Sequence, residues 1–359
     1  MKGTVIFPTI SIWYGIFVLF CFASILWAYQ PSSCFHVTSR IVQCWVIPFC
    51  MAQHYSTKEA LPRCLKLIAF ASMASSVYIL WQTPVAEWFS GSFGNVTTGL
   101  NPNMLGIIYT FGALISYFFA YHLHQKNYYI ISAYLVFIVI LTSSRKSTIS
   151  VLLGILLLTV LDATRKHLVL RIIAALAVLA LVFYLIMTVP SLYAAIGRRF
   201  DSMINFILQN EGDYSITIRL TFIRVAQQIF IENFLFGVGV VNFPVKLGTI
   251  MNISTYAHNN YYELLADLGI IGFSLYYSYY VYVAVATLKR ATCGSRYAKL
   301  MLTMILTILL CDIGIVSFYS AQINIFFACT SMFLSACDYQ KESATIGQSS
   351  LQLGSKSKG

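Results

Sequence analysis

Residues 256–273 read YAHNNYYELLADLGIIGF and place a histidine, two asparagines, a glutamate and an aspartate directly before an apolar segment. That segment continues to about residue 288, long enough for a helix to cross about 30 Å of hydrocarbon. Polar side chains next to a membrane span are costly unless they have partners or a function. The stretch therefore predicts a transmembrane helix whose outer end carries a polar cluster that needs an explanation.

The rest of the chain has the same apolar character. Its 359 residues are 58% hydrophobic and 10% charged, with a mean hydropathy of +0.75, whereas soluble proteins carry about 25% charged residues. We expect an all-α polytopic integral membrane protein with about ten transmembrane helices. Residues 1–340 then form one transmembrane domain, and 341–359 form a disordered cytoplasmic tail. The expected spans are 9–28, 41–55, 64–81, 104–122, 128–143, 147–163, 169–190, 268–288, 300–318 and 322–338.

The net charge of +11 follows from orientation rather than from binding of nucleic acid. With the N-terminus inside, 15 of the 23 basic residues lie on the cytoplasmic side, as the positive-inside rule requires. Five of the other eight belong to one large exported loop, about 191–267. Its sequence from 222 to 244 predicts an amphipathic helix and then a turn at Gly237 and Gly239, lying at the membrane surface. The eight exported basic residues are Arg40, Arg145, Lys146, Arg198, Arg199, Arg219, Arg224 and Lys246.

His258 is the exported histidine with polar neighbours. Helical spacing puts Asn259, Asn260, Glu263 and Asp267 on one face of the expected helix. One interpretation is a solvated helix cap, in which Asn259 accepts hydrogen bonds from free backbone amides. The other makes His258 a proton acceptor in catalysis.

Two further stretches carry exported cations. TSSRKS, residues 142–147, places Arg145 and Lys146 at the outer membrane surface, where they either snorkel among headgroups or bind a phosphorylated lipid head. GDYSITIRLTFIR, residues 212–224, carries Arg219 and Arg224, which are either solvated or bind a diphosphate. Asp312, inside an expected span, is either functional or paired with a neighbouring polar group.

The nine cysteines fall mostly within apolar stretches and show no Cys-x-x-Cys spacing, so we expect no disulfide framework and no thiolate metal site.

AHNNYYELLADLGIIGF resembles the His-Asn-x-Tyr-x-Glu-x-x-x-(Glu/Asp)-x-Gly signature of the O-antigen ligase and O-antigen polymerase superfamily of bacterial envelope enzymes. Three other stretches agree with that superfamily in order: NPNMLG, TSSRKS and IRLTFIRVAQQIFIENFLFGVGVVNF. The resemblance covers about residues 95–275.

The resemblance implies a glycosyltransferase of the bacterial cytoplasmic (inner) membrane, with its active site on the exported face and no metal or other cofactor. Its donor would be an undecaprenyl diphosphate-linked glycan. His258 would activate the acceptor hydroxyl, and Arg145 and Arg219 would contact the diphosphate. The resemblance implies two further roles less directly: Arg224 as another diphosphate contact and Glu263 as a second catalytic residue. The partners would be the lipid-linked glycan, membrane lipids and a polysaccharide chain-length regulator.

The acceptor stays open, because the shared motifs do not separate a polymerase from a ligase that transfers glycan to lipid A core. Lys146 also stands where the family often has a glycine. The short chain, without an added exported domain, favours a polymerase that makes O-antigen, capsule or exopolysaccharide. A flippase for lipid-linked sugars and a non-catalytic assembly partner are the alternatives.

Overall fold

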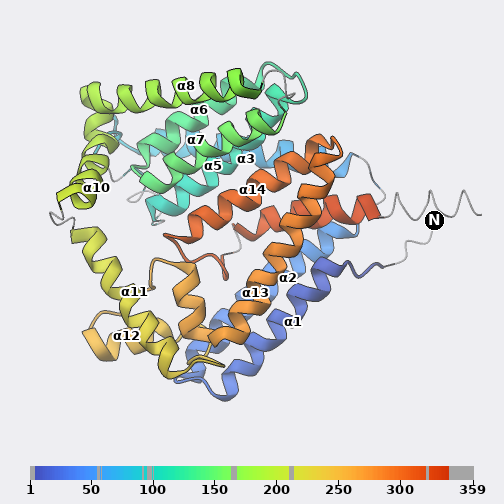
Figure 1. Ribbon diagram of the computed structural model, residues 1–359, viewed down its shortest axis with the longest axis vertical. Helices are drawn as coiled ribbons and strands as arrows, with labels where there is room; N and C mark the ends of the chain where they lie inside the picture. Colours follow the sequence, from blue (N-terminus) through green and yellow to red (C-terminus); the bar gives the residue numbers. More distant parts are fainter. Residues whose placement is uncertain are drawn as a thin grey trace, which may run out of the picture.

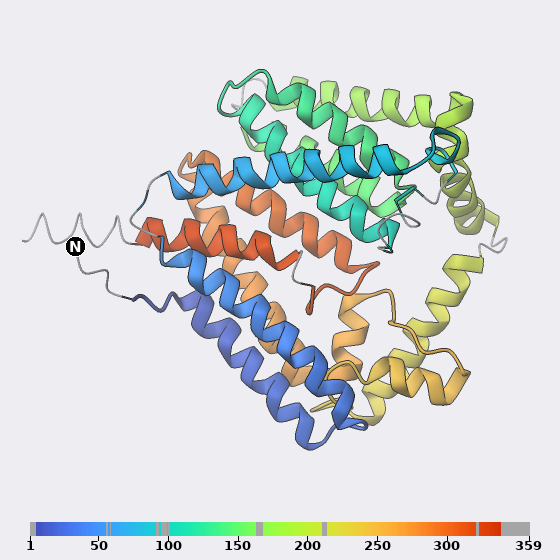
Figure 2. The same cartoon turned by 180° about the vertical axis from the view of Figure 1, so that it is seen from behind.

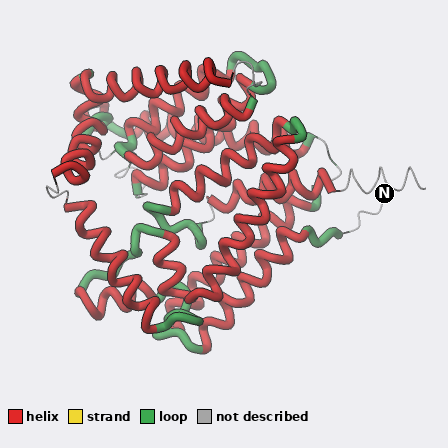
Figure 3. The backbone as a smooth tube through the Cα atoms, in the orientation of Figure 1, coloured by secondary structure: helices red, strands yellow, loops and turns green. Residues whose placement is uncertain are grey.

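The computed structural model describes residues 5–54, 57, 59–90, 93–94, 99, 101–162, 168–209, 214–320 and 323–338. Within these ranges the chain is helical and contains no strand (Figure 3). The all-α fold class is therefore confirmed. The expected tail, 341–359, lies outside the described residues.

The helices follow one another with short connections. Their bounds are α1 Thr9–Ala23, α2 Pro31–Ala52, α3 Ala60–Gln82, α5 Pro102–Tyr121, α6 Tyr128–Leu141, α7 Arg145–Leu161, α8 Leu168–Thr188, α9 Pro190–Leu192, α10 Arg198–Gln209, α11 Tyr214–Glu232, α12 Phe243–Met251, α13 Asn260–Thr292 and α14 Arg296–Asp312, followed by a helix at Ile323–Asp338. Single turns also occur at 24–26 and 85–87, and a π-helical turn at 193–197 joins α9 to α10.

Five described segments are long and apolar enough to cross a membrane: Thr9–Leu26, Ala60–Gln82, Pro102–Tyr121, Leu168–Thr188 and Asn260–Thr292. Others at expected spans are shorter, such as α6 with 14 residues and α7 and α14 with 17 each. The protein is thus a helical membrane protein, while the count of about ten spans and the exported position of the 191–267 loop stay predictions.

The helices form two packed groups joined by α14. One group contains α3, α5, α6 and α7, with α8 on its outside, and the other contains α1, α2 and α13 (Figures 1 and 2). α14 packs against both α7 and α13. α10, α11 and α12 lie on the side of the molecule away from the N-terminus (Figure 1). The predicted exported loop is therefore built of helices that border one side of the bundle.

Arg40 lies within a helix, although the expected spans 9–28 and 41–55 left it in the connection between them. The residue lies within α2, which begins at Pro31, ten residues before the apolar segment that the sequence suggested. Pro31 fits the first helical position because proline fixes φ and needs no intrahelical donor there. The helix therefore extends through polar residues that hydropathy alone assigned to a loop.

The predicted turn at Gly237 and Gly239 is confirmed, and it packs on a break in α13. Gly269 has a φ of 62°, so the α13 helix is interrupted there. The interruption leaves carbonyl oxygens of α13 without partners in the helix, and the turn supplies N–H groups to them. Val238 N–H donates to Ala266 O at 3.1 Å, and Gly239 N–H donates to Asp267 O at 2.8 Å. A Cβ on Gly237 would lie 2.4 Å from the Asp267 carbonyl, so only glycine fits this approach.

Candidate active site

His258 sits in the loop between α12 and α13, at the side where α11 approaches. Its backbone adopts φ of 56°, a left-handed conformation that is uncommon for residues other than glycine. The half-buried ring lies between Tyr256, with centroids 4.0 Å apart, and Phe222 of α11, with centroids 6.3 Å apart. No hydrogen bond joins the His258 side chain to another described residue. Both ring nitrogens are therefore available to a ligand.

Glu263 holds the backbone that presents His258. Its side chain is fully buried, and Oε2 accepts a hydrogen bond from Ala257 N–H at 2.5 Å. The second carboxylate oxygen, Oε1, is buried without a hydrogen-bond partner among the described residues. Glu263 thus holds the residue that precedes His258, and its expected role as a second catalytic residue stays a prediction.

The helix-cap interpretation is half right. Asn259 Oδ1 accepts from Tyr261 N–H at 3.0 Å and from Tyr262 N–H at 3.2 Å, so it caps α13 as expected. The cap is not solvated, however, because Asn259 is only 6% exposed. Asn260, Glu263 and Asp267 are fully buried on the same face. The sequence could not show which chain segments cover that face.

The buried Asn260 belongs to a hydrogen-bond network that also contains Asp312. Asn260 Oδ1 accepts from the backbone N–H groups of Ser317 and Phe318, at 2.8 and 3.2 Å. Its Nδ2 donates to Tyr277 OH and to Asp312 Oδ2, and Tyr277 OH also donates to that carboxylate oxygen at 3.0 Å. Asp312 is therefore paired with neighbouring polar groups, and the network joins the start of α13 to the segment after α14.

Asp267 fixes the segment that leads into α12. Its carboxylate accepts from Val241 N–H at 2.8 Å, Asn242 N–H at 3.1 Å and Phe243 N–H at 2.7 Å. These N–H groups lie at the start of α12, where backbone N–H groups have no acceptor within the helix. The polar residues of the opening stretch thus have distinct tasks: most clamp the surrounding chain, and His258 is left free.

Cations surround His258. Burial, followed by the charges of Arg219 and Lys146, lowers the pKa of His258 from 6.5 to about 4. The ring is therefore neutral at pH 7 and can accept a proton. Burial, followed by the charge of Arg219, also lowers the pKa of Lys146 to about 7, and Lys146 Nζ donates to Gly314 O. The structure thus brings Arg219 and Lys146 near the histidine, whereas the sequence placed Lys146 only at the outer membrane surface beside Arg145.

Arg145 is held at the tip of the turn between α6 and α7. Arg145 Nη1 donates to Arg199 O at 2.6 Å, and Arg199 Nη1 donates to Ser143 O at 3.2 Å. Ser144, the N-cap of α7, donates through Oγ to Asn103 Oδ1 at 2.9 Å. TSSRKS is therefore attached both to α10 and to the Asn-Pro-Asn start of α5.

Arg224 does not join this cluster. It lies five residues after Arg219 on α11, about 140° around the helix, and its side chain is exposed. Neighbouring Phe222 instead points toward His258. The expected role of Arg224 in binding a diphosphate stays a prediction without support from this arrangement.

A cavity of about 260 Å³ opens beside His258. Tyr256, whose ring contacts the histidine, lines it, and Asn101 Nδ2 donates to Tyr256 OH at 3.1 Å. The cavity combines aromatic rings, amides and one guanidinium, groups suited to a sugar ring and its hydroxyls. Sequence reasoning missed Tyr256, although it stands two residues before His258. The lining residues are Arg40, Asn101, Asn103, Met104, Tyr256, Ile315, Val316, Tyr319 and Ser320.

Residues 130–277 match the family model of O-antigen ligase. The matched region runs from α6 into α13 and contains Arg145, Arg219 and His258, so the resemblance seen in the sequence is confirmed there. No curated protein matches the chain. The match and the helical fold agree with a membrane protein of the O-antigen polymerase or ligase type.

Proposed function

Because residues 130–277 carry an O-antigen ligase-type domain, we propose that the protein is a glycosyltransferase that joins lipid-linked repeat units into a surface polysaccharide. The donor in this proposal is an undecaprenyl diphosphate-linked oligosaccharide, and the reaction takes place on the exported face of the bacterial inner membrane. A polysaccharide chain-length regulator is a proposed partner.

The observation that carries this proposal is the surroundings of His258. A neutral imidazole with both ring nitrogens free lies near Arg219 and Lys146 and beside a small cavity with both polar and apolar walls. The volume of this cavity, about 260 Å³, is below the range of about 300–1,000 Å³ for sites that bind drug-sized ligands. A cavity of this size suits one sugar ring. A base, cations for a leaving anion and a place for a sugar are the parts that glycosyl transfer requires.

The proposed step is a direct displacement. An acceptor hydroxyl gives its proton to a ring nitrogen of His258 while its oxygen forms a bond to the anomeric carbon of the donor sugar. The bond between that carbon and the diphosphate breaks, and its electron pair departs with the lipid diphosphate. Arg219 and Arg145 stabilise the developing negative charge, and the anomeric configuration inverts.

Donor binding itself would make His258 a better base. In the free protein, nearby cations lower the pKa of the histidine. A bound diphosphate places negative charge in the same region, which favours the protonated imidazole and raises its pKa. The histidine would therefore gain basicity when the leaving group is in place.

The same machinery suits a ligase, which differs in using lipid A core as acceptor. A flippase for lipid-linked sugar also needs cations that meet phosphates, but it has no use for a base placed beside a sugar-sized cavity. We favour the polymerase because the described residues between α8 and α13 form single helices, of at most 19 residues, with no added domain for a large acceptor.

The test is the set of glycans that cells make with wild-type protein and with His258→Ala, Arg145→Ala and Arg219→Ala at matched membrane levels. Lys126→Ala, an exposed change at the predicted cytoplasmic side, is the control. We expect single lipid-linked repeat units to accumulate on the exported face, without polymer, in the three site variants. Full-length polymer retained on its lipid carrier would indicate a ligase, and single units trapped on the cytoplasmic face would indicate a flippase.

A further inference from the structure

A second, larger cavity lies at the other end of the bundle from His258. Its volume is about 640 Å³, and it lies among α5, α6, α7 and α8. The α7 helix connects the two regions: Arg145 begins it, and Thr159, which lines the cavity, follows 14 residues later, about 21 Å along the helix. The cavity is therefore separate from the proposed catalytic site.

The lining is apolar along most of its length and polar at one end. Leu152, Ile155, Val178 and Val182 represent the apolar part, contributed by α7 and α8. The polar residues gather toward the C-terminal ends of α5 and α7 and the beginnings of α6 and α8. They are Tyr117, Tyr121, Tyr129, Ser132, Thr159 and Arg171. Such a lining matches a molecule with a long hydrocarbon chain and a polar head.

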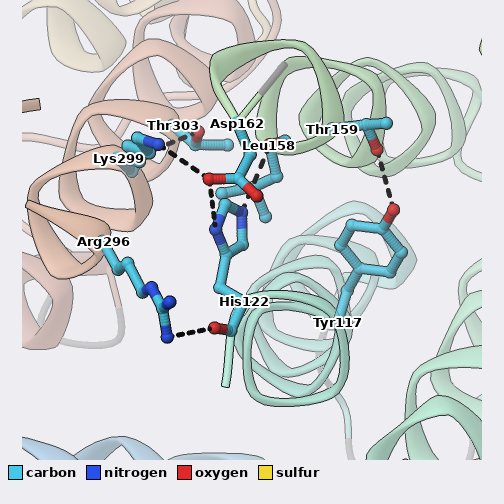
Figure 4. Close-up of polar contacts among 8 residues, drawn as sticks. All are labelled: Tyr117, His122, Leu158, Thr159, Asp162, Arg296, Lys299 and Thr303. Carbon is cyan, nitrogen blue, oxygen red and sulfur yellow. Dashed lines mark hydrogen bonds and ion pairs between the residues drawn. The ribbon is translucent and has the colours of Figure 1, made fainter. Parts of the chain in front are cut away.

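Arg171 supplies a cation at that polar end. Its Nη1 is buried and has no hydrogen-bond partner among the described residues. Asp162, whose carboxylate senses the Arg171 charge, already accepts from Lys299 Nζ at 2.8 Å and lies 3.6 Å from His122 Nδ1 (Figure 4). A buried donor of a charged group is costly when unsatisfied, so the site is suited to an anion.

The neighbouring hydroxyls do not satisfy the guanidinium. Tyr117 OH is hydrogen-bonded to Thr159 Oγ1 at 2.7 Å (Figure 4). Tyr117 and Tyr121 stack with centroids 5.4 Å apart, and Tyr129 meets Tyr117 edge to face at 6.1 Å. These rings form a fixed wall beside the cation.

The surrounding membrane can reach this cavity. Only 6% of the apolar window of α8 is buried, so this helix presents most of its surface outward. The first turn of α8 also belongs to the side that the positive-inside pattern assigns to the cytoplasm, whose leaflet is rich in anionic lipids. Hydrocarbon and anionic headgroups are therefore both available.

We propose that this cavity binds an anionic phospholipid, with its phosphate on Arg171 and one hydrocarbon chain between α6, α7 and α8. The positive charge of Arg171 favours an anionic phospholipid over the polyprenyl tail of the proposed donor. Such a tail carries its diphosphate at the His258 end and brings no anion to Arg171. The lipid site stands whether the protein is a polymerase or a ligase.

The test uses the full chain purified in detergent and then exposed to phosphatidylglycerol or phosphatidylcholine, with bound lipid measured by native mass spectrometry. Arg171→Gln removes the cation, Ala175→Phe fills the apolar part, and Lys126→Gln is an exposed control with the same change of charge. Size-exclusion chromatography checks that each variant is folded.

We expect wild type and Lys126→Gln to retain phosphatidylglycerol over phosphatidylcholine. Arg171→Gln should bind phosphatidylglycerol about tenfold more weakly, the effect of about one charge-assisted contact. Ala175→Phe should lose the bound lipid. Equal retention by wild type and Arg171→Gln, equal binding of the two lipids, or displacement of phosphatidylglycerol by an undecaprenyl carrier that needs no Arg171 would each overturn the proposal.

Discussion

The charge of Arg219 should set the protonation of His258, and a single substitution can measure it. The pKa of His258 lies at about 4, against an ordinary 6.5, and the causes in order of size are burial, Arg219 and Lys146. The difference, 6.5 − 4 = 2.5, corresponds to about 3 kcal/mol. Because burial contributes most, Arg219 accounts for less than half of it. In Arg219→Gln the pKa of His258 should therefore rise, by less than half of this difference.

Diethyl pyrocarbonate measures this pKa without requiring activity, because it modifies the neutral imidazole. The rate at which the reagent modifies His258 is measured between pH 3.5 and 7.5 by mass spectrometry of the peptide that contains this residue. The dependence of that rate on pH gives the pKa of His258. Modification should persist to lower pH in wild type than in Arg219→Gln, because protonation is suppressed by the neighbouring charge. Size-exclusion chromatography at each pH confirms that the protein remains folded.

Arg224→Gln is the matched control, since it removes the same charge from the same helix at an exposed position. It should leave the wild-type midpoint unchanged. Equal midpoints in wild type and Arg219→Gln would refute the electrostatic contact between Arg219 and His258. An equal increase in both variants would show that only the total charge of α11 matters, which contradicts the arrangement described above.

Four other substitutions, at three residues, probe the packing around the site. Glu263→Ala leaves Ala257 N–H without its acceptor and should cost about 1–3 kcal/mol, seen as a lower melting temperature, whereas Glu263→Gln keeps an acceptor and should lose less. Asp267→Asn weakens three backbone hydrogen bonds and should speed proteolysis near residues 241–243; unchanged cleavage would argue against this clamp. Gly269→Ala places a Cβ 2.4 Å from Leu235 O at a φ of 62°, so folded protein in the membrane should fall sharply, and a wild-type yield would contradict the close packing there.

The sequence by itself determined the class of protein and the position of its polar cluster. Long apolar segments can satisfy their backbone in a membrane only as helices, so the all-α membrane fold follows from composition. The quoted signature pointed to His258, the IRLTFIR stretch pointed to Arg219, and glycines at 237 and 239 predicted a turn, because these features depend on local sequence. Hydropathy placed the start of the second span at 41, whereas α2 begins at Pro31 and so contains Arg40.

Only the tertiary structure decided which polar residues are free and which are bound. One face of α13 carries Asn260, Glu263 and Asp267, and the sequence gives no reason to assign them different roles. In the structure each side chain accepts a hydrogen bond from a backbone N–H of a different segment. Arg219 and Arg224 belong to one helix, but the direction of each side chain differs. Such distinctions depend on contacts between residues distant in sequence, which hydrophobic and charge patterns along one chain do not encode.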